Sequence, residues 1–254
     1  MKKLICGMLV AGCGLVRADV ADGLWFYANF DAPTFLDGAV VEKGPSADRI
    51  VEGRFGRGAC LGGEKAWDEG RFYRFSDEDL MRRFPLANGT FSCWYLATNS
   101  TSRTAASPGF CVGPYSRRHF GFNGGTDFSL ANAQTPSFRL KRAPSRADRW
   151  RHFAITWTPT SVVAYLDGAE VGRFEGQLER TIDYSQPGAF WIGSFADRTK
   201  SPDTKLDELA IFSRTLTAEE VQALAKAESP LVVEPKVCLS EFAYPVFYRN
   251  QTNA

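Results

Sequence analysis

The stretch DRWRHFAITWTPTSVVAYLDGAEVG, residues 148–172, decides the fold. Polar and apolar side chains alternate in HFAITW (152–157), and SVVAYL (161–166) follows after a short connection. Such alternation is typical of β-strands with one buried face. Asp167 and Gly168 then precede another extended run, and Asp-Gly is a preferred pair in tight hairpin turns because both residues tolerate positive φ. The stretch therefore predicts two successive β-hairpins.

His152 lies in the first of these strands and is one of only two histidines in the chain. With a period of two, His152, Ala154 and Thr156 share one face of the strand. A catalytic histidine needs a nucleophile and an orienting carboxylate, and a metal-binding histidine needs further ligands. The other histidine is His119, and the sequence has no Gly-x-Ser-x-Gly motif. We therefore interpret His152 as a hydrogen-bonded structural residue of a sheet.

The period-two pattern recurs on both sides of this stretch, with turn residues in between. Further strand-like runs occupy residues 24–31, 59–63, 90–98, 109–113, 119–125, 170–176, 189–195 and 205–214. Near the end, TAEEVQALAKA (217–227) has a capping box and an apolar stripe, so it predicts a short helix. The pattern as a whole predicts an all-β protein built as an antiparallel sandwich or barrel, with a short C-terminal helix.

The bulk composition fits one large globular domain, or one domain and part of a second. The chain has 254 residues, of which 44% are hydrophobic and 23% are charged. Its formal net charge is +1, so no overall positive field favours nucleic acid as a partner.

The first 18 residues have the pattern of an export signal. MKK is followed by a short apolar run that is too short to span a membrane. One interpretation is a signal peptide (1–18) that is cut before Asp19. The other is a lipobox, VAGC (10–13), which would make Cys13 a lipid anchor. Both interpretations predict a bacterial protein that is secreted or lies at the cell surface. A periplasmic protein and an outer-membrane lipoprotein are both compatible with this prediction.

Four cysteines remain after such a signal: Cys60, Cys93, Cys111 and Cys238. An even number in an exported chain permits disulfides. However, Cys93 and Cys111 lie in apolar strand-like runs, where cysteine often serves as a small buried hydrophobic residue. No CxxC pair is present, which argues against a zinc site.

Four segments in a fixed order resemble LamG-like, concanavalin A-like jelly-roll domains of the laminin G type 3 kind. They are WFYANFD (25–31), GRFGRGACLGG (53–63), RWRHFAITWTPTSVVAYLDGAEVG (149–172) and LDELAIFSRTLTAEEVQAL (206–224). The resemblance covers residues 22–227 and implies two packed antiparallel sheets. It leaves residues 228–254 as a tail or as the start of a second β domain. Domains of this kind are mostly binding or spacer modules; some bind glycans and some bind calcium.

Glycoside hydrolases share this jelly roll and are the enzymatic alternative. Those enzymes resemble one another in a Glu-x-Asp-x-x-Glu strand, in which alternation puts the acid and the nucleophile on one face. This sequence has no such string. Its nearest match is KLDELAIF (205–212), where Asp207 and Glu208 are adjacent and are expected to point to opposite faces. We therefore expect no catalytic residues.

A calcium site is expected where the first and last strands of the domain meet. Such strands usually pair in a jelly roll, which would bring Asp31 close to Asp207 or Glu208. Calcium prefers several oxygen ligands, and the resemblance implies acidic residues at these places. The alternative is a structural network in which these carboxylates accept hydrogen bonds from loop amides.

A cationic region supplies the candidate ligand-binding residues. They are Tyr115, Arg117, Arg118, His119, Arg139 and Arg142. Guanidinium groups pair with carboxylates or sulfates, and aromatic rings stack on sugars. These residues predict an acidic polysaccharide or glycoconjugate as ligand; the alternative is a set of cations that keep loops and strand edges soluble. The sequence thus predicts an exported, non-catalytic binding module with carbohydrate as the leading ligand. A protein-binding structural or adhesive module is a third alternative.

Overall fold

The computed structural model describes residues 20–31, 44–63, 72–75, 78–97, 110–114, 120–122, 127–128, 138–139, 149–177, 188–193 and 201–231. Its larger sheet is antiparallel, with β1 (Leu24–Ala28) paired to β14. The strand order is β12 (Ala169–Glu175), β11 (Ser161–Leu166), β10 (Arg151–Thr158), β5 (Gly89–Ala97), β14 (Ser201–Phe212), β3 (Arg57–Gly63), β2 (Ile50–Glu52). The signal peptide expected at 1–18 and the tail after residue 231 lie outside the described residues.

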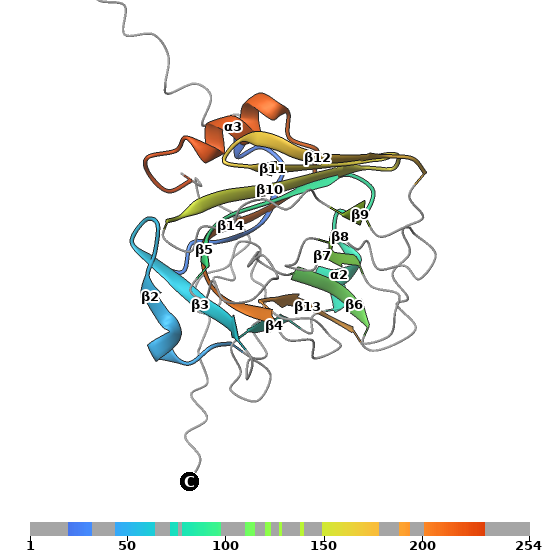
Figure 1. Cartoon of the computed structure of the whole chain (residues 1–254). Helices are drawn as coiled ribbons and strands as arrows, with labels where there is room; N and C mark the ends of the chain where they lie inside the picture. Colours follow the sequence, from blue (N-terminus) through green and yellow to red (C-terminus); the bar gives the residue numbers. More distant parts are fainter. Residues whose placement is uncertain are drawn as a thin grey trace, which may run out of the picture.

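A smaller antiparallel sheet faces the larger one, so the expected two-sheet sandwich is confirmed (Figure 1). It consists of β4 (Tyr73–Phe75), β13 (Gly188–Ile192), β6 (Phe110–Pro114) and β7 (Phe120–Phe122). The remaining elements are a 3-10 helix (Ala47–Arg49), α2 (Glu78–Arg82), the pair β8 (Asp127–Phe128) and β9 (Phe138–Arg139), and α3 (Ala218–Ala225). Among the described residues, no helix is long and apolar enough to cross a membrane.

The main core lies between the two sheets and is rich in aromatic rings. From β10 it takes Phe153, Ile155 and Trp157, which is the face that the alternation predicts for them. Rings from different strands pack edge to face or stacked; for example, the ring centroids of Phe91 and Phe110 are 4.6 Å apart. Such contacts add to the free energy of burial. This core fixes the larger sheet, whose opposite face carries the site described below.

A second, smaller core covers the outer face of the larger sheet. Ala154 of β10 and Phe212 of β14 pack there with Val221, the fully buried residue of α3. Figure 1 shows α3 lying across this face. The helix begins where the sequence predicts: Thr217 Oγ1 accepts from the backbone N–H of Glu220, and the Glu220 carboxylate accepts from the backbone N–H of Thr217.

The two predicted hairpins are present. β10 pairs with β11 from Phe153–Leu166 to Thr158–Ser161, and β11 pairs with β12. Asp167 and Gly168 both have positive φ, at 51° and 79°, as an Asp-Gly hairpin turn requires.

The pairing of the first and last strands is also confirmed. The N-terminal part of β14 pairs with β3, and its C-terminal part pairs with β1. On its other side β14 pairs with β5, and the register shifts by one residue between Asp207 and Ala210. Glu208, within this shift, has φ of 52°. This is a β-bulge, and it lies where β14 changes its partner from β3 to β1.

Candidate functional site

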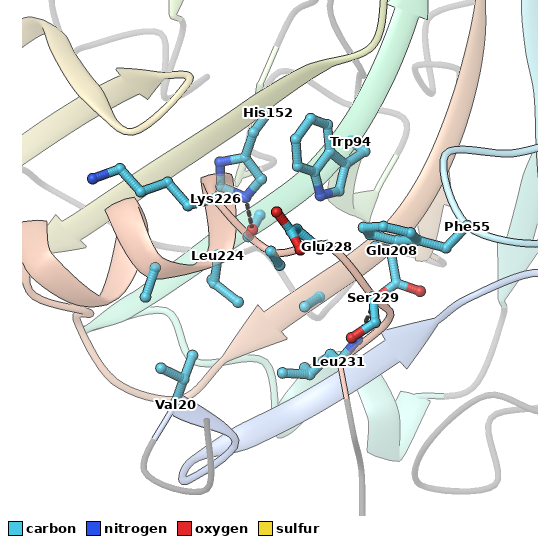
Figure 2. A pocket seen from close by; sticks show the side chains of 14 residues that line it. Val20, Phe55, Trp94, His152, Glu208, Leu224, Lys226, Glu228, Ser229 and Leu231 are labelled. Carbon is cyan, nitrogen blue, oxygen red and sulfur yellow. Dashed lines mark hydrogen bonds between the residues drawn. The ribbon is translucent and has the colours of Figure 1, made fainter. Parts of the chain in front are cut away.

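A pocket of about 540 Å³ opens on the outer face of the larger sheet. Its floor comes from β5, β10 and β14, and its walls come from the end of α3, the segment 226–231 and the β2–β3 turn (Figure 2). It therefore combines residues from both ends of the described chain with residues from the centre.

Ser92, Trp94 and His152 form the floor. Trp94 and His152 are paired across β5 and β10, and their rings pack edge to face with centroids 5.4 Å apart. Figure 2 shows the indole nitrogen of Trp94 turned toward the cavity. Within the described residues this N–H has no hydrogen-bond partner, so the floor offers a hydrogen-bond donor at the edge of an otherwise buried indole.

His152 is a structural residue of this floor, as the sequence predicts. Its Nε2 is 2.9 Å from Ser92 Oγ, and its backbone N–H donates to Asp167 Oδ1 (3.0 Å). Burial lowers the pKa of His152 from 6.5 to about 3, because the charged form would lose its hydration. The imidazole is therefore neutral near pH 7, and its Nδ1 is buried without a partner among the described residues.

Glu208 and Glu228 bring carboxylates to the pocket. The Oε2 atom of Glu208 accepts hydrogen bonds from the Tyr27 hydroxyl (2.7 Å) and from the backbone N–H of Leu231 (2.7 Å). These two bonds attach the segment after α3 to the sheet. Burial and the adjacent Glu208 carboxylate raise the pKa of the Tyr27 hydroxyl well above its usual value, so this hydroxyl remains a donor. Glu228 is exposed, and Figure 2 shows its carboxylate beside Trp94.

The bulge corrects one expectation about Asp207 and Glu208. Strict alternation would put these neighbours on opposite faces of the sheet. Leu206 and Leu209 both enter the inner core, however, so both residues between them are displaced from it. Asp207 contacts the β2–β3 turn, and Glu208 lines the outer pocket. A one-residue bulge changes which face a side chain occupies, and nothing in the local sequence marks it.

Asp207 is fully buried and holds the β2–β3 turn. Its Oδ2 accepts from the backbone N–H of Phe55 (2.8 Å), and its Oδ1 accepts from that of Glu208 (2.8 Å). Burial raises the pKa of Asp207 to about 7; the hydrogen bond from Phe55 acts in the opposite direction, and the Glu208 charge raises it further.

Asp31 holds the same turn from its other side. Its Oδ1 accepts from the backbone N–H of Arg57 (2.7 Å). Gly56, with φ of 57°, lies so close to this carboxylate that a Cβ there would collide with it. The structure thus brings Asp31 and Asp207 to one turn, where both accept loop amides, as in the network alternative. Among the described residues, no group of three or more His, Cys, Asp or Glu side chains is arranged to hold a metal ion. Calcium stays a prediction.

The turn presents Phe55 to the pocket and places Arg54 beside it, against two of its rings. Phe55 packs edge to face on Trp94, with ring centroids 6.2 Å apart. The guanidinium carbon of Arg54 is 4.8 Å from the centroid of the Phe55 ring and 4.9 Å from that of the Trp94 ring. Stacking of this kind fixes a cation through the ring quadrupole. Asp31 and Asp207 therefore position Arg54 and Phe55 beside the floor.

The predicted cationic site lies almost entirely outside the described residues. The side chains predicted there at positions 115, 117, 118, 119 and 142 lie outside the described residues. Arg139 ends β9 opposite Asp127, and its side chain is not described. Cys93, which the sequence analysis interprets as a small buried hydrophobic residue, is a buried free thiol, and Cys60 is a partly buried free thiol.

Sequence reasoning missed the pocket itself. Alternation in TFSCWYLAT (90–98) would have placed Ser92 and Trp94 on one face with His152, because β5 and β10 pair. The contribution of Glu228 and Leu231 could not have been found, because it depends on how the segment after α3 returns to the sheet.

A family model described as the concanavalin A-like lectin/glucanases superfamily, laminin G type 3, matches residues 35–222. No curated protein is significantly similar to the chain in sequence.

Solved structures show the same fold at low identity. The binding domain of botulinum neurotoxin serotype C1 is 15% identical with a TM-score of 0.59, over 82% of this chain and 52% of that one. Domain 4 of AbnA, an extracellular arabinanase from Geobacillus stearothermophilus solved with arabinotriose, is 21% identical with a TM-score of 0.54. The match covers 80% of this chain and 98% of that domain. The binding domain of Paraclostridial mosquitocidal protein 1 is 16% identical with a TM-score of 0.53, and the match covers 81% of this chain and 52% of that one. The chain spans about half the length of the toxin binding domains that it matches.

Proposed function

The chain belongs to the concanavalin A-like lectin/glucanases superfamily, in its laminin G type 3 family, and on this premise we propose that it is an exported, non-catalytic carbohydrate-binding module. The binding site is the pocket on the outer face of the larger sheet. The observation that carries the proposal is the composition of this pocket: a Trp94 indole with its N–H toward the cavity, beside the Glu228 carboxylate. Sugars bind through an apolar ring face and peripheral hydroxyls, and such a pocket offers partners for both.

The comparisons support a binding role at the level of the fold. An arabinanase domain solved with arabinotriose and the binding domains of two toxins share the fold. The family also includes glucanases by its name, so likeness alone does not decide between binding and hydrolysis.

The carboxylates of the site argue against hydrolysis. Asp207 is fully buried, and both of its oxygens accept backbone N–H groups. One oxygen of Glu208 is engaged by Tyr27 and Leu231. A retaining glycosidase needs an acid and a nucleophile that both reach the scissile bond, and these two side chains instead hold the turn and the segment after α3.

Export is the second part of the proposal. It rests on the Lys-Lys start and apolar run of the first 18 residues. A bacterial cell surface or its surroundings would supply polysaccharides as ligands.

Affinity electrophoresis against neutral and acidic polysaccharides tests the proposal. We expect at least one polymer to retard the native chain. Trp94→Ala should raise the dissociation constant obtained from that retardation roughly thirtyfold, because removal of a central aromatic contact commonly costs about 2 kcal/mol. Trp150→Ala is the matched control, because Trp150 is partly buried and outside the pocket. Melting temperatures establish that both variants fold.

A second pair of variants tests the acidic wall. Glu228→Gln changes a pocket carboxylate, and Glu219→Gln changes an exposed carboxylate in the first turn of α3. We expect only Glu228→Gln to weaken retardation. No retardation by any polymer, or equal losses in the members of each pair, would contradict the proposal.

A further inference from the structure

Three arginines of the described structure form close ion pairs with a carboxylate, whereas Arg54 does not. Arg151 pairs with Asp167 at 2.6 Å, Arg173 pairs with Glu170 at 2.8 Å, and Arg214 pairs with Glu220 at 2.7 Å. The Arg54 side chain is exposed and, within the described residues, has neither a hydrogen bond nor an ion pair. Its contacts are the two rings of Phe55 and Trp94.

These ring contacts fix the guanidinium without neutralising it. Stacking engages the flat face of the group and leaves its N–H donors free at the edge. An arginine that is held in this way loses little side-chain entropy when it binds an anion. The guanidinium fork matches the two oxygens of a carboxylate or sulfate.

The backbone under Arg54 is held as firmly as its side chain. Asp207 accepts from the N–H of the next residue, Phe55, and Asp31 accepts from the N–H of Arg57. The N–H of Gly53 also donates to the carbonyl of Gly56 across the turn (3.0 Å). A small rigid turn therefore presents one cation next to the pocket floor.

We propose that Arg54 binds the carboxylate or sulfate of an acidic sugar that also accepts a hydrogen bond from the Trp94 indole N–H in the pocket. This inference rests on the proposed carbohydrate-binding function and names its ligand class. The ligand's hydroxyl groups donate to the Glu228 carboxylate, which would repel an anion placed there. The negative group is therefore expected to pair with the Arg54 guanidinium, and neutral hydroxyls are expected to pair with Glu228.

Paired polymers that differ only in charge test this assignment. The probes are polygalacturonate, alginate, hyaluronate and chondroitin sulfate, each compared with its carboxyl-reduced form and, for chondroitin sulfate, also its desulfated form. We expect the native chain to bind at least one acidic polymer more tightly than its neutral form. Arg54→Gln should weaken the binding of that acidic polymer roughly ten- to hundredfold, the usual range for a hydrogen bond to a charged group. It should leave the affinity for the neutral form unchanged.

Arg57→Gln is the matched control, because it removes the same charge from an exposed arginine of the same turn. Only Arg54→Gln should abolish the preference for the acidic form. Equal losses in both variants would show general charge attraction and would overturn the assignment. Equal binding of charged and neutral forms by the native chain would overturn it too, but would leave carbohydrate binding intact. Binding of neither form, in these pairs and in the wider panel above, would refute the carbohydrate-binding function as well.

Discussion

His152 is buried and neutral, so its effect on stability depends on pH. It is buried between Trp94 and α3, and it is held by Ser92 through one ring nitrogen. The pKa of His152 is about 3 in the native state and 6.5 in the unfolded chain. Between these pH values the unfolded chain therefore binds a proton that the native state does not. The contribution of His152 to stability is therefore present above pH 6.5 and is lost as pH falls through this window.

Replacement of His152 by Gln should remove this pH dependence. The amide can still pair with Ser92, and it does not titrate. We expect the native chain to lose up to about 1.4 kcal/mol per pH unit more than His152→Gln between pH 6 and pH 4. Urea unfolding at several pH values measures the difference. Parallel curves for the two proteins would contradict the buried, neutral histidine.

Asp207 should show the opposite dependence. Burial raises the pKa of its carboxyl to about 7, so between about pH 4 and pH 7 the native state binds this proton more tightly than the unfolded chain. The contribution of Asp207 to stability therefore falls as pH rises through this window. Carbon-13 NMR should find its side-chain carboxyl titrating near pH 7. A midpoint near 4 would mean that its backbone donors outweigh its burial.

At the scale of elements, α3 closes the pocket as well as covering the sheet. Its last turn and the segment after it carry Leu224, Lys226 and Glu228 to the cavity. The helix has only eight residues, so its N-terminal cap and its packing on the sheet together determine its stability.

Thr217→Ala should therefore loosen this wall. Loss of the cap commonly costs about 1 kcal/mol, and we expect a lower melting temperature together with faster amide exchange in α3. Thr217→Ser keeps the hydroxyl and should behave as the native protein does. Unchanged exchange in Thr217→Ala would mean that packing alone holds the helix.

Some features of these elements could be predicted from the sequence, and the bulge in β14 could not. The β10–β11–β12 hairpins and the α3 cap depend on nearby residues, such as Asp167 and Gly168 or Thr217 and Glu220, and they were predicted. The bulge at Glu208 depends on where β14 changes partners, which is a property of the folded sheet. It was not predicted, and it determines how Asp207 and Glu208 are used.

At the scale of the whole molecule, the two ends of the described chain meet on the outer face of the larger sheet. Val20 and Leu231 both line the pocket, and Tyr27 and Leu231 share Glu208. The alternation of β5 and β10 made three floor residues of the pocket predictable, namely Ser92, Trp94 and His152. Its walls depend on contacts between distant residues, such as Tyr27 and Leu231, which are 204 positions apart in sequence.

The predicted calcium site would join three distant parts of the chain: the end of β1, the β2–β3 turn and β14. If Ca²⁺ binds to Asp31 and Asp207, calorimetry of the EDTA-treated chain should detect uptake, and saturating Ca²⁺ should raise the melting temperature. Asp31→Asn should abolish both effects. A titration without heat and without a thermal shift would leave the two carboxylates as structural acceptors of loop amides.

We propose that the pocket above Trp94 binds carbohydrate. A nitrogen-15 NMR titration with the polysaccharide fragment that binds best tests it most directly, because each of the six tryptophan indoles gives its own signal. We predict that the Trp94 indole N–H and the backbone amides of residues 226–229 shift together and saturate with one affinity. Shifts confined to residues outside the pocket, with the Trp94 signal unmoved, would contradict the claim.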